Sequence, residues 1–157
     1  WGLRGLEYLW YGIGAVIRKH PEIKYLFGAV SIPGDYSESL LQEMVNHYSH
    51  HYPKPDSAPK MVAQNPFSVT ASSDEIDCKV AFKSLLKQIK SAGMKLPILY
   101  KQYTDLCESG GVGFINFARD PEFNNCVDGL IWLELDRMKA SKKAKYITPN
   151  NSLNEAS

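Results

Sequence analysis

The sequence predicts one mixed domain of α-helices and β-strands, an α/β (alpha+beta) fold, and three observations support this class. Apolar residues recur every three or four positions in several segments, which is the period of a helix with one buried face. Three shorter runs are almost continuously apolar and lie between turn-forming residues, as buried strands do. The 157 residues, 44% hydrophobic and 22% charged, can form one packed core and are too apolar for a disordered chain.

The first predicted elements are a helix over residues 3–19 and a strand over residues 25–32. The helix has apolar residues three and four positions apart and ends before Pro21. Gly12 and Gly14 interrupt it, and each costs about 1 kcal/mol of helix stability relative to alanine. We therefore expect a neighbouring backbone to pack closely against both glycines. The strand is a short apolar run, YLFGAVSI, which we expect to be buried.

The middle of the chain is predicted to be helical, with one long interruption. A helix begins after Ser37, a suitable N-cap residue, and stops before Pro53. Residues 53–78 contain four prolines and a stretch rich in Ser and Asp, so we expect a long loop or mobile insertion. Helical spacing returns over residues 80–89 and, for a shorter stretch, near residues 96–107.

The last predicted elements are two apolar runs, residues 112–117 and 127–135, joined by a turn-rich segment. Such a pattern is typical of a hairpin or of two neighbouring strands. Residues 1–146 then make up one domain. Residues 147–157 are polar and offer little to bury, so we expect a disordered tail.

Charge and cysteine content exclude several classes of function. Eighteen basic residues oppose seventeen acidic ones, and the net charge of +1 gives no global field to attract nucleic acid. The three cysteines, Cys78, Cys107 and Cys126, are widely spaced and form no C-x-x-C pair. This spacing argues against a disulfide framework or zinc knuckle and favours a cytoplasmic setting. No apolar run approaches the roughly 18–20 residues of a membrane span.

An ordered series of segments resembles one known family. The series begins with WGLRGLEYLWYGIGA at residues 1–15 and YLFGAVSI at residues 25–32. It continues through residues 99–108, 110–112 and 123–130. Together these segments closely resemble the later half of the GNAT-like N-acyltransferases of the branch named for hemolysin, to which the ornithine-lipid synthases belong.

This resemblance covers nearly all of residues 1–146 apart from the 53–78 loop. It implies a GNAT-like fold with a mixed central sheet flanked by helices, whose first strands would precede Trp1. It also implies transfer of an acyl group from a thioester of acyl carrier protein or coenzyme A to the α-amine of an amino acid, with ornithine as the first acceptor. No permanently bound cofactor is implied. Peripheral contact with the inner membrane is a further expectation.

The same resemblance assigns a binding role to the strand over residues 25–32. A GNAT-type fold binds the thioester where two central strands splay apart, and this segment would be the second of those strands. Val30, Ser31 and Ile32 would then lie along the pantetheine arm. A chain that begins at Trp1 would lack the first strand of the pair and would therefore carry an incomplete catalytic site.

The start of the first helix is the candidate phosphate site. Unpaired N–H groups at a helix N-terminus attract anions, Gly2 and Gly5 would allow close approach, and Arg4 would add charge. The alternative is a frayed end with a solvated arginine. Arg4 stands where the family's loop carries a small residue, so acyl carrier protein is as suitable a donor as coenzyme A.

Two tyrosines are candidates for protonating the departing thiolate. By resemblance, Tyr48 falls where GNAT enzymes place such a donor, and Tyr36, which follows the strand, is the weaker candidate. The alternatives are a core tyrosine at position 48 and a loop aromatic at position 36. Glu108 and Asp128 are candidates for holding an ammonium-bearing acceptor, although structural roles for both stay open.

Two other patterns have simpler interpretations. His47, His50 and His51 have helical spacing but no carboxylate or cysteine nearby in sequence, so we expect a surface histidine cluster and no metal site. The basic residues after position 136 are interpreted as a solvated helix end, with attraction to an acyl carrier protein or an anionic membrane as the alternative. They are Arg137, Lys139, Lys142, Lys143 and Lys145. The competing function is a noncatalytic GNAT-like module that binds a carrier protein or membrane surface.

Overall fold

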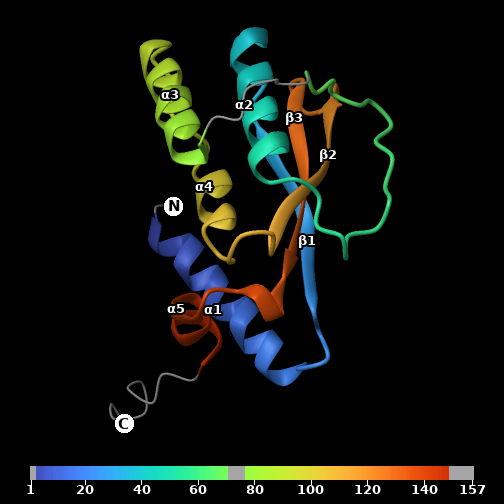
Figure 1. The fold of residues 1–157 in the computed structure, drawn as a ribbon, viewed down its shortest axis with the longest axis vertical. Coiled ribbons are helices and arrows are strands. Elements are labelled where there is room, and N and C mark those ends of the chain that lie inside the picture. The colour runs from blue at the N-terminus through green and yellow to red at the C-terminus, as the bar shows by residue number, and fades with distance from the viewer. Residues whose placement is uncertain (1–2, 71–76, 149–157) are drawn as a thin grey trace.

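The computed structural model describes residues 3–70 and 77–148, with the side chains of Leu3 and Arg4 left out. Its main helices and strands follow the predicted order (Figure 1). They are α1 (Leu3–Lys19), β1 (Tyr25–Ile32), α2 (Glu38–His51), α3 (Cys78–Ser91), α4 (Ile98–Thr104), β2 (Val112–Asp120) and β3 (Cys126–Glu134). Short helical turns close the described chain: η1 (Leu135–Arg137), α5 (Ala140–Lys142) and η2 (Lys143–Ile147). The mixed class of helices and strands is confirmed.

The strands form a three-stranded sheet in the order β1-β3-β2, and both pairings are antiparallel. β2 and β3 are therefore the predicted neighbours, and β1, far away in sequence, joins the other side of β3. β1 consequently lies at an edge of the described sheet. Its register with β3 places Val30 opposite Gly129 and Ser31 opposite Asp128.

The helices cover one face of this sheet (Figure 1). Tyr48 from α2, Tyr100 from α4 and Phe114 from β2 meet there, with ring centroids 4.7 to 5.5 Å apart. Val30 and Ile32 point into the same core and are 2% and 0% exposed. Because side chains alternate along a strand, Ser31 points to the opposite face. The two faces of β1 thus differ: one packs on the core, and the other is exposed, with Tyr25 and Phe27 40% and 67% exposed, and polar near the strand's end. The prediction of a buried strand is therefore wrong for this second face.

Local signals explain where α2 and α3 begin. The Ser37 side chain accepts a hydrogen bond from the Leu40 N–H, and Asp77 accepts bonds from the N–H groups of Lys79 and Val80. Each satisfies backbone donors that a first helical turn leaves unpaired. The Ser37 cap was predicted from sequence and is confirmed.

The long segment after α2 runs beside β2 as an extended loop (Figure 1). Its backbone joins β2 near both ends, because Phe114 N–H donates to the Tyr52 carbonyl and Arg119 N–H to the Asn65 carbonyl. Between these points Asn116 donates to the Met61 carbonyl over 3.0 Å. The predicted loop is therefore tethered to the sheet over its described part, up to residue 70.

The two glycines of α1 differ in their surroundings. A Cβ at Gly14 would overlap the Tyr146 carbonyl of the C-terminal turn, so the predicted close packing is confirmed there. At Gly12 a Cβ would meet no heavy atom within 4 Å, and the same prediction is wrong. The turn that packs on Gly14 is η2, so the described residue 147 belongs to a helical turn where a disordered tail was predicted. Residues 149–157 of the predicted tail lie outside the described residues.

Candidate functional site

An apolar cleft of about 180 Å³ lies between α1 and the edge strand β1. Its walls come from α1, α4, β1 and β3, and none of the lining residues is charged. The side chains that form its floor are Trp10, Ile13, Tyr103, Ile131 and Leu133. β1 contributes residues 26–30 along its length, so the cleft follows the strand.

Small residues in β1 leave this cleft open. Gly28 and Ala29 line it, and a Cβ added at Gly28 would meet no heavy atom within 4 Å. Among the described residues, β1 pairs with β3 alone. The cleft therefore combines a free strand edge with space that no side chain fills.

A polar pair follows the cleft directly along β1. The Ser31 hydroxyl donates to Asp128 Oδ1 over 2.5 Å, linking residues 97 positions apart. On the other face of the strand, the Tyr100 hydroxyl donates to the Val30 carbonyl over 2.7 Å. Because the Val30 and Ile32 side chains are buried in the core, these two residues can contact a ligand mainly through their backbone N–H and C=O groups.

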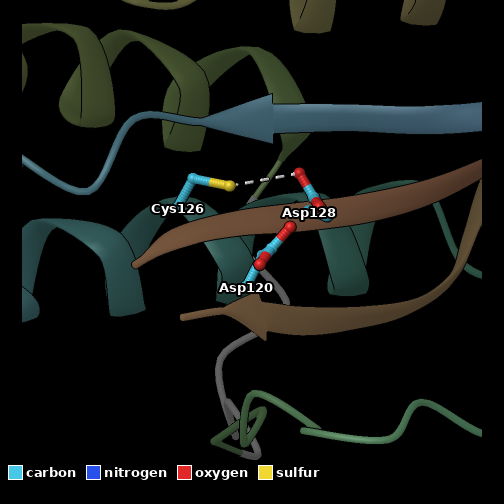
Figure 2. A group of neighbouring side chains, drawn as sticks. All are labelled: Asp120, Cys126 and Asp128. Carbon is cyan, nitrogen blue, oxygen red and sulfur yellow. Dashed lines mark hydrogen bonds between the residues drawn. The ribbon is translucent and has the colours of Figure 1, made fainter. Parts of the chain in front are cut away.

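Asp128 also belongs to a cluster that was not predicted. Asp120, Cys126 and Asp128 each bring a ligand-type atom within 4.8 Å of the others (Figure 2). The Cys126 thiol donates to Asp128 Oδ1 over 3.5 Å, and burial together with Asp128 raises its pKa. The antiparallel register places Asp120 opposite Cys126. Sequence reasoning singled out Asp128 but could have found its two neighbours only from the exact hairpin register.

The cluster can accept a cation or an ammonium group, because two carboxylates converge on it. Exposed acidic groups commonly gather without an ion, however, and no further group in the described residues points to one. We therefore assign no metal to it.

Tyr48 and Tyr36 lie away from the cleft lining. Tyr48 is 1% exposed, and its hydroxyl has no hydrogen-bond partner among the described residues. Burial raises its pKa well above the usual value, so it is a weaker acid than a solvated tyrosine. The Tyr36 hydroxyl donates to the Lys95 carbonyl, and burial raises its pKa as well. These positions match the alternatives of a core tyrosine and a packed loop aromatic.

The two candidate acceptor carboxylates do not share a site. Glu108 is exposed in the turn before β2, where its N–H donates to the Arg137 carbonyl. The Gly111 carbonyl of this turn accepts from Glu134 N–H, at the end of β3 that lies away from Asp128. Asp128 is thus the candidate that adjoins Ser31.

The proposed phosphate site lies largely outside the described residues. Gly2 belongs to the part that is not described, and so does the side chain of Arg4. Gly5 is exposed in the first turn of α1.

The histidine cluster differs from its prediction. His47 is 7% exposed, and its ring lies 4.7 Å from that of His51 and 5.6 Å from that of Phe82 on α3. The expectation of a surface cluster is therefore wrong for His47. Burial, followed by the nearby His51 and His50, lowers the pKa of His47 to about 4.

The basic residues near the C-terminus have partners within the chain. Lys139 and Lys142 both contact Asp105, at 2.6 and 2.8 Å, and Lys145 contacts Glu7 at 2.6 Å. Arg137 and Lys143 donate to backbone carbonyls. This basic segment therefore contributes to packing at the C-terminal end. Within residues 3–70 and 77–148, no helix combines the length and apolar character needed to cross a membrane.

One known protein is distantly similar to the chain. A glycine N(alpha)-acyltransferase of Bacteroides thetaiotaomicron is 26% identical over 157 aligned positions. The similarity covers 93% of this chain but 44% of the relative, so the chain spans less than half the length of that protein. No protein-family model matches the chain, and no solved structure matches it. The chain therefore has a distant relationship to an N-acyltransferase.

Proposed function

We propose that this chain contributes the acyl-donor side of an N-acyltransferase, which moves an acyl group from a thioester of coenzyme A or acyl carrier protein to the α-amine of an amino acid. The distant similarity to a glycine N(alpha)-acyltransferase supports the reaction class. The mixed fold and the resemblance to GNAT-like enzymes agree with it.

One observation carries the proposal: an apolar cleft lies along the edge strand β1, and a serine–aspartate pair that joins β1 to β3 begins at the next residue of that strand. The cleft lining ends at Val30, and Ser31 with Asp128 follows at the next position. An extended thioester lying along β1 would have its apolar part in the cleft and its polar part beyond Val30, where the other face of the strand presents this pair. A free strand edge also offers unpaired backbone groups to such a ligand.

Asp128 is proposed to hold the ammonium form of the acceptor before the reaction. A carboxylate forms short, charge-assisted hydrogen bonds with an ammonium group. Before the transfer the ammonium group loses one proton to solvent. The resulting amine attacks the thioester carbonyl, a C–N bond forms, and the C–S bond breaks. The amine nitrogen loses a second proton to solvent, and the departing thiolate takes one up from its proton donor, which solvent then reprotonates.

The proton for the thiolate is proposed to come from Tyr48, with Tyr36 as the second candidate. The Tyr48 hydroxyl has no partner among the described residues, so a bound ligand could provide one. The Tyr36 hydroxyl already donates to the Lys95 carbonyl. Because burial weakens Tyr48 as an acid and Tyr48 lies away from the cleft lining, this role requires the thioester sulfur to reach past the lining to the Tyr48 hydroxyl.

Two acceptors follow from the two lines of similarity. Glycine is the acceptor named for the relative, and ornithine is the one that the family resemblance suggests. Docking of a carrier protein or the inner membrane on the basic segment stays a prediction, since the side chains of that segment already have partners within the chain.

The test is thiol release from acyl-coenzyme A and acyl carrier protein thioesters in the presence of glycine, ornithine, glutamine or lysine. We expect amine-dependent release and an N-acyl amino acid detectable by mass spectrometry. Asp128→Asn should raise the KM for the amine at least tenfold, while Glu43→Gln, at an exposed carboxylate on α2, should not. No thiol release with any amine, combined with binding of acyl carrier protein, would favour the noncatalytic module.

A further inference from the structure

The cleft beside β1 has the properties of a site for an aliphatic chain. Its lining has no charged side chain, and its floor is well ordered by packing. Trp10, Val30 and Leu133 are 3%, 2% and 2% exposed, so their positions are fixed by neighbours inside the core. The Trp10 ring also meets Tyr103 edge-on, with centroids 5.7 Å apart. A ligand would therefore meet an apolar wall that is already formed.

Gly28 is the residue that keeps this cleft open. The glycines Gly14 and Gly129 are needed for packing, because a Cβ would strike Tyr146 at the first and Phe114 at the second. Gly28 faces no such neighbour, and its φ lies outside the positive range that would require glycine. Glycine inside a strand weakens the strand and often marks close approach of a ligand. Neither backbone conformation nor packing within the described residues explains this glycine.

We propose that the cleft holds the aliphatic chain of the acyl donor and that Gly28 sets the bulk and length of chain that can enter. This inference rests on the proposed N-acyltransferase function and adds a residue that determines which acyl chains the site accepts. The chain would lie with its far end toward Leu26 and Trp10. Its thioester end would lie beyond Val30, the residue of β1 at which the cleft lining ends.

The inference predicts a dependence of affinity on chain length. Each methylene buried in an apolar site adds roughly fourfold in affinity. The gain must stop when the cleft is full. Valine at position 28 would occupy space now open in the cleft, so the plateau should come at a shorter chain.

A binding measurement tests this without relying on catalysis. The chain has three tryptophans, so Trp1→Phe and Trp132→Phe leave Trp10 as the fluorescent reporter. The probes are saturated fatty acids of increasing length that carry bromine at the terminal carbon, which quenches tryptophan on contact. We expect quenching of Trp10, with an affinity that rises about fourfold per methylene to a plateau.

Gly28→Val should weaken binding of the longest probe at least tenfold. The matched control is Gly12→Val, because a Cβ there also meets open space but outside the cleft. Both substitutions suit their local structure at least as well as glycine does. Circular dichroism verifies that each variant folds. If Gly28→Val does not fold, Gly28→Ala replaces it, with an expected loss of about threefold.

Absent quenching, affinity independent of chain length, or equal effects of the two glycine substitutions would overturn the inference. The proposed function fails separately. Binding of the aliphatic chain without thiol release would support the cleft assignment and contradict the proposed enzyme activity. Thiol release with an unchanged chain-length preference in Gly28→Val would support the enzyme activity and contradict the cleft assignment.

Discussion

The sheet has a closed part around Gly129 in β3, where side chains fill the space, and an open part around Gly28 in the adjacent strand β1, where they do not. At Gly129 the missing side chain makes room for Phe114 and Phe117, whose ring atoms would lie 2.8 Å from an added Cβ. At Gly28 the missing side chain makes room for nothing in the described protein. The same residue type thus serves packing in one place and leaves a cleft in the other. Glycine content alone cannot distinguish these roles.

The largest expected effect on stability is in the closed part of the sheet. Phe114 is 4% exposed and stacks on Tyr100 and Phe117, with centroids 5.4 and 5.0 Å apart. Phe114→Ala should lower the free energy of unfolding by about 3–5 kcal/mol, because it removes buried apolar contacts and leaves a cavity. Urea unfolding measures this. Phe123→Ala, at a ring that is 67% exposed, is the control and should cost far less.

A pH effect of nearly that size is expected at the α2–α3 contact. The pKa of His47 is lowered to about 4 in the folded protein, against about 6.5 in the unfolded chain. Below pH 6.5 the unfolded chain therefore binds a proton that the folded protein does not. Stability should fall as the pH drops from 6.5 toward 4, by a total on the order of 3 kcal/mol.

Urea unfolding at several pH values measures this loss. His47→Phe should flatten the dependence in that window, whereas His20→Gln, at an exposed site, should keep it. A wild-type curve that is level between pH 6.5 and 4 would contradict the assigned burial of a neutral imidazole.

Substitution of the two glycines sharpens the comparison directly. Gly129→Ala should cost about 1–3 kcal/mol, because the new methyl group overpacks against Phe114 and Phe117. Gly28→Ala should be neutral or slightly stabilising, because alanine has less conformational freedom to lose on folding. Thermal unfolding of both variants gives the answer. Equal losses would mean that the space beside Gly28 is not open.

The smallest expected effect distinguishes two buried tyrosines. Tyr100→Phe removes a hydrogen bond to the Val30 carbonyl and should cost about 1 kcal/mol. Tyr48→Phe removes a hydroxyl without a partner among the described residues, so stability should stay level or rise by up to about 1 kcal/mol. Thiol release tests the proposed role of Tyr48 as a proton donor. If Tyr48 has this role, Tyr48→Phe should lower kcat at least tenfold. A fall in stability of Tyr48→Phe equal to that of Tyr100→Phe would indicate a hidden partner.

The fold was more predictable than the site. Ser37 and the apolar run of residues 25–32 marked α2 and β1, because capping and periodicity act within a few residues. Asp128 and Ser31 were both predicted as candidates, but for different roles, and Asp120 and Cys126 were not predicted. Asp128 and Ser31 are 97 positions apart, and strand register alone brings them together.

The sequence by itself determined the order of the elements and most of their bounds, since hydrogen bonding within a helix and burial along a strand depend on neighbouring residues. Only the tertiary structure decided that β1 lies at an edge of the described sheet, that His47 is buried, and that Gly28 borders open space while Gly14 does not. Those properties depend on which distant segments pack together. Packing is set by the whole core at once, so no local pattern records it.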